Sequence, residues 1–335
     1  MSMDHNYIIE GLGYRLRPVS LKDAEYIIKV RLEDLNRTRH IHSIAGKIED
    51  EEKWIKEYLG RKGDYFFIIE NRFTDKPEGT VAIFFEKDGS VEWGRWITNK
   101  GSFAFLESAY LIYKFGFYDL KVEEICCRTN AENKPVVSFH DSIGSLKRGI
   151  RKDYFQINDR RVDACEHYTD RTHFENVMIP IFLNKIVKIY RRMLRIYLGE
   201  FTFDHIGIAV KSIDEEISKY LLEGYELNDA LFEDFEQGIK GQFLAQSGCP
   251  RIELLENLEG EHTLDPYLKA GKKMYHRGYY VGNLEAAIEF LKKSRAKVIS
   301  SPKQSVYFKK RVCFLVMPNM ELIELMERNE NDESK

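Results

Sequence analysis

The stretch that decides the fold is FTFDHIGIAV, residues 201–210, which returns as KKMYHRGYYV at residues 272–281. A second stretch, FLAQSGCPRIELLE at residues 243–256, returns as FLVMPNMELIELME at residues 314–327. Both repeats have the same offset of 71 residues. Internal repetition of this kind predicts two modules of one fold that pack against each other.

The repeat preserves two polar residues inside apolar strand patterns. His205 aligns with His276, and Glu253 aligns with Glu324. Because side chains alternate along a strand, His205 shares a face with Gly207 and points away from the neighbouring isoleucines. Two imidazoles and two carboxylates suit Zn, Ni, Co, Mn or Fe(II) and leave positions open for water or substrate. We therefore expect one divalent metal site; the alternative is a metal-free fold.

With these motifs, residues 201–328 resemble the vicinal oxygen chelate superfamily, which includes glyoxalase I, methylmalonyl-CoA epimerase, extradiol dioxygenases and fosfomycin-resistance proteins. The resemblance implies paired βαβββ modules with ligands on the first and last strand of each module. The metal ligands so implied are His205, Glu253, His276 and Glu324.

The motifs DHIGIAV, IELLENLE and NLEAAIEFLKK are most similar to methylmalonyl-CoA epimerase. This similarity implies enolisation, in which a metal polarises a carbonyl group and a carboxylate, which we assign to Glu324, moves the α-proton. Arg277 and Tyr280 stand where the family more often has small or apolar residues. The substrate therefore stays open, and glyoxalase-like isomerisation or lyase chemistry would use the same four ligands.

The first 172 residues alternate strand-like and helix-like patterns. We expect strands at 14–19, 65–71, 79–86, 90–97 and 123–129, then an antiparallel pair, KRGIRKDYFQI with RRVDACEHY. We expect helices after Ser20 as N-cap and at 49–59, 102–117 and 132–143. The fold class is therefore α+β, with a mixed sheet flanked by helices followed by the paired modules.

The stretch NKPVVSFHDSIG, residues 133–144, and this order of elements resemble a GCN5-related N-acetyltransferase (GNAT) over residues 12–170. The family has Asn, then Tyr, then Gly, at the places that Asn133, His140 and Gly144 occupy. The family Tyr protonates the departing thiolate of coenzyme A. The resemblance implies this role for His140, as an imidazolium. The alternative is a helical His that caps or packs.

The resemblance also implies acetyl-CoA or another acyl-CoA as donor, bound at the turn before the 102–117 helix. The family has an Arg/Gln-x-x-Gly-x-Gly/Ala turn there, whereas this chain has TNKGS at residues 98–102. Backbone N–H groups at a helix N-terminus can still face a phosphate. The expected cofactor-binding residues are Ile97, Asn99, Lys100, Gly101, Ser102 and Asn133.

Glu92 lies in the predicted strand VEWGRWI, where the central strands of GNAT proteins diverge around the thioester. A carboxylate there can take a proton from an amine, so Glu92 is the candidate general base. Alternation places Glu92, Gly94 and Trp96 on one face and Trp93 and Arg95 on the other. The alternative is a surface ion pair of Glu92 with Arg95 or a Lys.

His40 and His42, in RTRHIHS, either reach the pocket for the acceptor amine or lie in a solvated loop. The motifs EWGRWI and NKPVVSFHDSIG are most similar to GNAT proteins that acylate amino sugars for bacterial surface glycans. The resemblance therefore implies a small amine acceptor, such as a nucleotide-linked amino sugar.

Residues 173–200 are expected to form an amphipathic helix that connects a domain at 1–172 to a domain at 201–328, with a solvated tail at 329–335. The helix carries five cations and no acid on its polar face: Lys185, Lys188, Arg191, Arg192 and Arg195. We interpret it as a connector between domains or subunits, and we expect a homodimer. The alternative is a helix that lies on an anionic membrane.

Composition narrows the class of protein. The chain has 335 residues and a net charge of −3, which gives no electrostatic case for nucleic acid as a partner. Five Cys without CxxC spacing indicate a reduced intracellular protein. Since no apolar run reaches about 18 residues, we expect a cytoplasmic protein without membrane insertion.

Three functions remain. The first is a bifunctional enzyme, an N-acyltransferase fused to a metal-dependent epimerase or isomerase, both acting on small molecules. The second is an N-acyltransferase whose glyoxalase-like domain serves dimerisation or ligand binding without catalysis. In the third, the N-terminal domain only binds a small molecule and the C-terminal enzyme acts. We prefer the first.

Overall fold

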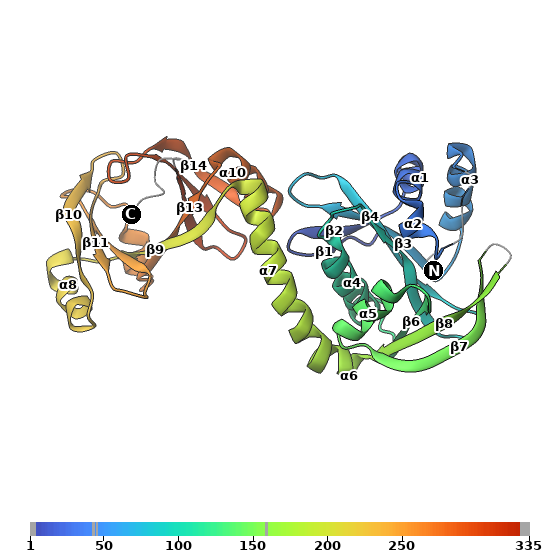
Figure 1. Ribbon diagram of the computed structural model, residues 1–335. Helices are drawn as coiled ribbons and strands as arrows, with labels where there is room; N and C mark the ends of the chain where they lie inside the picture. Colours follow the sequence, from blue (N-terminus) through green and yellow to red (C-terminus); the bar gives the residue numbers. More distant parts are fainter. Residues whose placement is uncertain (1–4, 42–43, 45, 158–159, 329–335) are drawn as a thin grey trace. The chain divides into compact units, whose positions relative to one another are not determined.

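The computed structural model describes residues 5–41, 44, 46–157 and 160–328. His42 and the expected tail at 329–335 lie outside the described residues. The chain divides into two compact units, Met1–Arg191 and Arg192–Lys335. Each unit is built on one eight-stranded sheet with helices beside it (Figure 1), which confirms the α+β fold class.

The sheet of the first unit has the order β1-β2-β3-β4-β5-β6-β8-β7. Its neighbouring strands are antiparallel except β5 and β6, which run parallel. The strands are β1 Ile9–Glu10, β2 Tyr14–Pro18, β3 Asp64–Asn71, β4 Pro77–Phe85, β5 Val91–Thr98, β6 Glu124–Asn130, β7 Leu146–Ile157 and β8 Arg160–Asp170.

Helices cover both faces of this sheet. They are α1 Ala24–Leu32, α2 Leu35–Thr38, α3 Ile48–Leu59, α4 Ala104–Lys114 and α5 Lys134–Ser142, with a π-helical turn, Phe115–Asp119, after α4. Ile27 of α1 and Ile55 of α3 pack on Phe66 of β3 in one buried cluster. On the other face, Trp93 of β5 contacts Tyr113 of α4, with ring centroids 5.5 Å apart. β3 is therefore buried along its whole length, and β4 is buried from Gly79 to Ile83.

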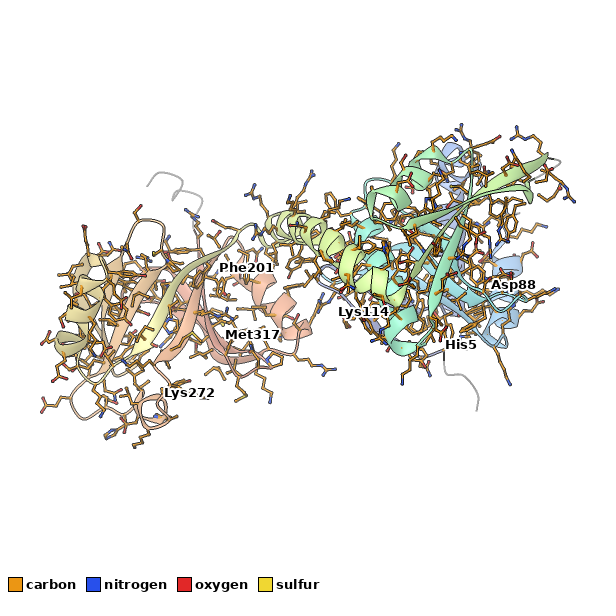
Figure 2. All side chains as sticks on the ribbon, turned by 90° about the horizontal axis from the view of Figure 1, so that it is seen from below. His5, Asp88, Lys114, Phe201, Lys272 and Met317 are labelled. Atoms are coloured by element: carbon orange, nitrogen blue, oxygen red, sulfur yellow. The ribbon has the colours of Figure 1, made fainter. Side chains whose placement is uncertain are left out.

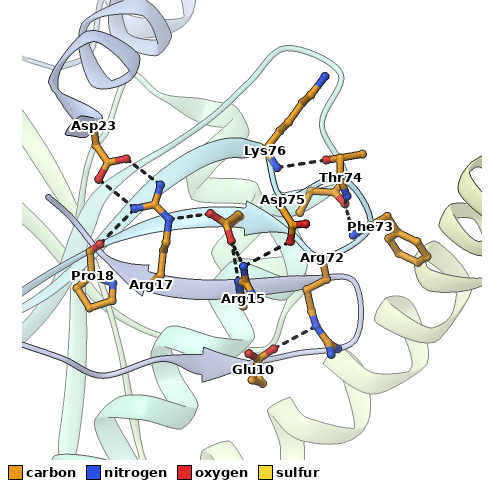
Figure 3. Close-up of polar contacts among 12 residues, drawn as sticks. Glu10, Arg15, Arg17, Pro18, Asp23, Arg72, Phe73, Thr74, Asp75 and Lys76 are labelled. Carbon is orange, nitrogen blue, oxygen red and sulfur yellow. Dashed lines mark hydrogen bonds and ion pairs between the residues drawn. The ribbon is translucent and has the colours of Figure 1, made fainter. Parts of the chain in front are cut away.

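Ion pairs tie the edge of the sheet to the start of α1 (Figure 3). Arg17 of β2 pairs with Asp23 and with Glu70 of β3, each at 2.7 Å. Asp23 also accepts the N–H of Ser20 at 2.8 Å, and a short 3₁₀ turn, Leu21–Asp23, precedes α1. The expected N-cap Ser20 therefore begins a 3₁₀ turn rather than the α-helix itself.

A bulge in β5 corrects the alternation expected from the sequence. Arg95 has a φ of 46°, and the register with β4 shifts beside it. Trp96 therefore lies on the same face as Trp93, with ring centroids 5.3 Å apart. Arg95 pairs with Asp64 at 2.6 Å rather than with Glu92. A single residue with positive φ is enough to reverse the faces that follow it.

The sheet of the second unit has the order β10-β11-β12-β9-β13-β16-β15-β14. The strands are β9 Phe201–Ala209, β10 Glu226–Asp234, β11 Ile239–Ala245, β12 Arg251–Asn257, β13 Met274–Val281, β14 Lys297–Gln304, β15 Arg311–Val316 and β16 Leu322–Glu327. Its helices are α8 Ile213–Leu222, α9 Asp265–Lys269 and α10 Leu284–Lys293.

The repeat in the sequence becomes a repeat of pairing. Each module pairs its first and last strands in parallel, β9 with β12 and β13 with β16. The two first strands, β9 and β13, join the modules in antiparallel pairing. Because β9 and β13 run antiparallel, Phe201 and Lys272 lie at opposite ends of this pair of strands (Figure 2). The N-caps repeat too, since Ser212 and Asn283 each accept a backbone N–H at the start of their helix.

The helix α7, Ile179–Leu198, follows a short turn of α-helix, α6 Arg171–His173, and a π-helical turn, Phe174–Met178. Phe182, Ile186 and Met193 are buried, whereas Leu183 and Ile196 are exposed. No helix among the described residues has both the length and the apolar run needed to cross a bilayer.

Candidate functional site

Four polar side chains meet on the central strands of the second unit. Across β12, β9 and β13 the neighbouring residues are Glu253, Gly207 and His276; across β9, β13 and β16 they are His205, Gly278 and Glu324. The pairing of the strands therefore brings the four expected ligands together in two adjacent rows.

The spacing of these side chains is that of a coordination shell. The Nε2 atoms of His205 and His276 are 2.9 Å apart. Glu253 Oε2 lies 3.4 and 3.2 Å from these two nitrogens, and Glu324 Oε2 lies 3.4 and 3.5 Å from them. Metal–ligand bonds of about 2.1 Å place ligand atoms about 3.0 Å apart at right angles and about 3.4 Å apart at tetrahedral angles. The donor set thus fits a single divalent cation.

All four side chains are buried. The carboxylates stabilise positive charge on the imidazoles, and the imidazoles stabilise negative charge on the carboxylates. Burial would lower the pKa of His205, but hydrogen bonds with Asp204, Glu253 and Glu324 raise it well above its ordinary value. The pKa of His276 is raised for the same reason, against its burial. Burial would raise the pKa of Glu253, but the hydrogen bonds with the two imidazoles lower it to about 2. The ionised carboxylates therefore demand a positive charge between them, from protons or from a cation.

The two imidazoles are held differently. His205 Nδ1 lies 2.9 Å from Asp204 Oδ2, and Arg251 pairs with Asp204 at 2.5 Å. A carboxylate in this position fixes the tautomer that leaves Nε2 for a metal. In the second module Tyr275 replaces Asp204, and His276 Nδ1 has no hydrogen-bond partner among the described residues. The first module is therefore the more rigid half of the site.

Two glycines make room for the imidazoles. A Cβ atom on Gly207 would lie 2.3 Å from the Cε1 atom of His276. A Cβ atom on Gly278 would lie 2.0 Å from the Cε1 atom of His205. Each histidine therefore occupies the space that a side chain on the other module's first strand would fill.

The space beside the four ligands is small. A cavity of about 20 Å³ is lined by Glu253, His276 and Glu324, and Tyr307 and Phe308, from the turn between β14 and β15, also line it. The ring of Phe308 stacks on the ring of His205, with centroids 5.7 Å apart. A cavity of this volume holds about one water molecule, so an organic substrate has no room while the two aromatic rings stay in place.

A cavity of about 840 Å³ opens in the first unit where β5 and β6 diverge. Within the described part of the chain, these two strands pair only at Glu92 opposite Cys126. Residues 93–97 of β5 and 127–130 of β6 line the cavity beyond that pair, together with residues of α1, α3, α5 and β7. Diverging strands leave backbone N–H and C=O groups that a ligand can pair with.

Glu92 lies at the point of divergence. Its carboxylate lines the cavity and pairs with Arg128 of β6 at 2.5 Å. Burial raises the pKa of Glu92 to about 7, although Arg128 acts in the opposite direction. A carboxyl group with this pKa can accept a proton at neutral pH. The sequence left open a general base or a surface ion pair with Arg95 or a Lys. Glu92 does form an ion pair, but its partner is Arg128, and both residues line the cavity.

His140 of α5 lines the same cavity and is fully buried. Burial, with help from the neighbouring His167, lowers the pKa of His140 to about 3. His140 Nε2 lies 3.3 Å from Cys127 Sγ, and the ring of His140 stacks on that of His167 with centroids 5.0 Å apart. The imidazole is therefore neutral, which corrects the imidazolium expected from the sequence.

The turn before α4 holds four of the six expected cofactor-binding residues. Gly101 has a φ of 78° and open space where a Cβ atom would stand. The Ser102 hydroxyl donates to Glu78 at 2.6 Å, and Asn99 accepts the hydroxyl of Tyr26 at 2.8 Å. Lys100 is exposed. Ile97 and Asn133, the other two, line the large cavity, whereas the four turn residues are not among those that line it.

Comparison with known families separates the two units. Residues 16–166 match the acetyltransferase (GNAT) domain, and residues 204–314 match the glyoxalase/bleomycin resistance protein/dioxygenase superfamily. The chain joins a GNAT domain to a glyoxalase-type domain. No curated protein matches the chain significantly.

Solved structures similar to this chain are GNAT proteins. One is described as apo FdhC, a nucleotide-linked sugar GNAT, at 28% identity over 55% of this chain and 98% of that one, with a TM-score of 0.43. A GCN5-related N-acetyltransferase from Brucella melitensis shares 16% identity over 52% of this chain and 84% of that one, with a TM-score of 0.47. A point mutant of spermidine N-acetyltransferase SpeG from Vibrio cholerae shares 18% identity over 50% of this chain and 98% of that one, with a TM-score of 0.43. All three TM-scores are below 0.5, so we base nothing further on these similarities.

The sequence alone did not indicate two parts of these sites. Arg128 and Cys127, beside Glu92 and His140 in the GNAT domain, were not singled out, although Arg128 is the one charged residue in the buried stretch ICCRTN. Tyr307 and Phe308, which line the site in the glyoxalase-type domain, left no signal, because their position depends on a turn without a recognisable motif. His40 lines the large cavity, as one of the two expectations for it requires.

Proposed function

We propose that the GNAT domain is an acyl-CoA-dependent N-acyltransferase that acts on a small amine. The observation that carries this proposal is the 840 Å³ cavity at the divergence of β5 and β6, with Glu92 in its lining where the two strands separate. An acyl-CoA supplies a thioester, whose carbonyl carbon an amine can attack. Every other part of the reaction then falls to the residues that line the cavity.

Glu92 is the general base. An amine loses a proton as it attacks a carbonyl group, and Glu92, with a pKa of about 7, takes that proton directly or through water. The free backbone N–H groups along the edge of β5 beyond Glu92 can donate to the carbonyl oxygen as it gains negative charge. His140, being neutral, contributes a polar N–H group rather than a positive charge near the departing sulfur.

We infer that the acceptor is an amino sugar, including a nucleotide-linked one. Aromatic side chains form much of the wall and offer flat apolar surface to a sugar ring or a base: Trp54, Phe66, Phe84, Trp96, Tyr154 and Phe155.

The test is release of free coenzyme A from acetyl-CoA in the presence of a panel of amines. Amino sugars and their nucleotide-linked forms should stimulate release, and spermidine should not. The variant Glu92→Gln should lose this stimulated release, while Glu57→Gln, an exposed residue of α3, should keep it. If no amine in the panel stimulates release, and acetyl-CoA gives no heat in calorimetry at millimolar concentration, the GNAT domain is the passive partner and the proposal fails.

We propose in addition that the glyoxalase-type domain binds one divalent cation, Zn, Ni, Co, Mn or Fe, through His205, Glu253, His276 and Glu324. Three of these, His205, His276 and Glu324, offer ligand atoms within 4.8 Å of one another. A cation there would act as a Lewis acid on a substrate carbonyl or enolate oxygen. Glu324 would move the proton in the epimerase-like reaction of the bifunctional proposal.

Metal analysis and an exchange experiment test this second proposal. The full chain should carry one divalent metal ion, and His205→Ala or Glu324→Ala should lose it, while His262→Ala, an exposed histidine of the same domain, should keep it. A racemic 2-methylacyl-CoA in deuterated water should exchange its α-proton with the loaded protein. The small volume of the cavity favours the alternative, in which this domain binds a metal but does not catalyse a reaction. Metal binding without proton exchange would support that alternative.

A further inference from the structure

Arg128 is a buried cation between two buried acids. Its side chain is 2% exposed, and it pairs with Glu92 at 2.5 Å on one side and lies 3.7 Å from Glu166 on the other. It also donates a hydrogen bond to the Ser90 hydroxyl at 3.3 Å. A guanidinium group out of water is tolerated only where carboxylates and acceptors surround it, so these partners define its place in the fold.

Glu166 is held in turn by the hairpin of β7 and β8. It is 2% exposed, and it pairs with Arg151 and with Arg148, the latter at 3.3 Å. The ring centroid of Tyr154 lies 5.7 Å from the guanidinium carbon of Arg128 and 5.8 Å from that of Arg151. Tyr154 lines the large cavity. A continuous network therefore joins the general base to the hairpin that forms one wall of the cavity.

The network balances its charges only when the base is ionised. Arg148 has a further partner, Glu124, at 2.8 Å. Three guanidinium groups then face three carboxylates: Arg128, Arg148 and Arg151 against Glu92, Glu124 and Glu166. Removal of Arg128 would leave Glu92 without its ion-pair partner and Glu166 with Arg148 and Arg151 alone.

We propose that Arg128 is the positioning residue of the acyl-transfer site: it holds the Glu92 carboxylate at the divergence of β5 and β6, and Glu166 holds Arg128. This inference rests on the proposed function of the GNAT domain. Burial already raises the pKa of Glu92 to about 7 with Arg128 beside it, so the loss of the guanidinium moves that pKa further up.

Other groups near Glu92 do not replace Arg128. Glu86, from the turn after β4, raises the pKa of Glu92 further. Cys126 and Cys127 of β6 and Tyr154 of β7 also lie near it, and burial raises the pKa of each of the three. They are therefore uncharged at neutral pH. Arg128 is the one cation among the causes that set the pKa of Glu92 in the described residues.

The test follows the Glu92 carboxyl group directly. Full-length protein with ¹³C-labelled Glu side chains is titrated by NMR, and the signal of Glu92 is the one missing from Glu92→Gln. Its midpoint should move up by about one pH unit or more in Arg128→Met, and by less in Arg128→Lys, which keeps the charge. It should not move in Arg17→Met, which removes a partly exposed arginine from its pair with Asp23 and Glu70. An unchanged midpoint in Arg128→Met or, if that variant does not fold, in Arg128→Gln overturns the proposal.

Kinetic measurements distinguish a positioning role of Arg128 from a purely structural one. In Arg128→Met, kcat/KM at neutral pH should fall about tenfold for each unit by which the midpoint rises, and it should recover at higher pH. A loss that is equal at every pH contradicts the proposal. If Glu92→Gln keeps full activity, the proposed function fails, but the NMR titration still decides whether Arg128 sets the state of Glu92.

Discussion

At the scale of single residues, the proposed metal centre depends as much on two glycines as on its four candidate ligands. The candidate ligands come from strands of both modules, and each imidazole occupies space over a glycine of the other module. The sequence pointed to these four residues because a duplicated pattern repeated them. It also placed Gly207 and Gly278 in the same register, but their role could be recognised only when the antiparallel pairing of β9 and β13 was known.

Gly207→Ala and Gly278→Ala should each remove the metal. An added methyl group would meet the imidazole ring at 2.3 or 2.0 Å, so His276 or His205 has to leave its position. Overpacking of this kind costs about 1–3 kcal/mol of unfolding free energy. Metal content measured by mass spectrometry of the purified protein should fall to background, and the melting temperature should drop. Gly248→Ala, in open space within the same domain, should retain its metal.

If Glu92 is the base, as proposed, it should give the acyl-transfer reaction its dependence on pH. The base works when ionised, so with a pKa of about 7 the value of kcat/KM should be constant above that pH. Below it, kcat/KM should fall about tenfold per pH unit. Glu92→Gln should lose that acidic limb and about 10²–10⁴-fold in rate at pH 8. A pH profile that stays flat down to pH 5 would show that another group takes the proton.

At the scale of elements, hydrophobic periodicity placed the expected strands and helices of the first unit to within a few residues, but it did not predict β1 or α2. Alternation failed in β5, because the bulge at Arg95 depends on the tertiary pairing with β4. Gly94, the residue before it, is a local mark of such a bulge that the alternation pattern did not take into account. The protonation state of His140 was also beyond the sequence, since it follows from complete burial beside Trp93 and His167.

We expect the turn before α4 to contribute to the binding of acyl-CoA, although its residues do not line the large cavity. Gly101 has a positive φ, so Gly101→Ala should strain the turn by about 1–2 kcal/mol and displace the N-terminus of α4. We expect affinity for acetyl-CoA, measured by calorimetry, to fall at least severalfold. Gly89→Ala is the matched control, since Gly89 has a φ of 83° and equally open space, in the turn between β4 and β5. Equal affinities in the two variants would remove this turn from the donor site.

We expect the turn between β14 and β15 to limit access to the proposed metal centre. Phe308 stacks on His205, and the Tyr307 hydroxyl donates to Asp229 at 2.5 Å. Phe308→Ala should open the 20 Å³ cavity and speed the removal of metal by a chelator, followed by the absorbance of a metal indicator. Phe235→Ala, an exposed aromatic residue of the same domain, should not change that rate. If both variants release metal at the wild-type rate, the aromatic pair is not the barrier.

At the scale of the whole molecule, two domains of different ancestry share one chain. The repeat identified the glyoxalase-type domain and the order of elements identified the GNAT domain. Activity, in contrast, is not encoded in the fold, since each of these folds carries many reactions. The proposed functions therefore rest on sites, Glu92 with Arg128 in one domain and the four metal ligands in the other.

The most direct test of the central claim is titration of the full chain with acetyl-CoA by isothermal calorimetry. The proposed acyltransferase should bind one acetyl-CoA per chain, with a dissociation constant between about 1 μM and 1 mM, as is usual for enzyme substrates. Tryptophan fluorescence should change in the same titration, because Trp93 and Trp96 line the cavity. Absence of heat and of any fluorescence change at millimolar acetyl-CoA would contradict the account.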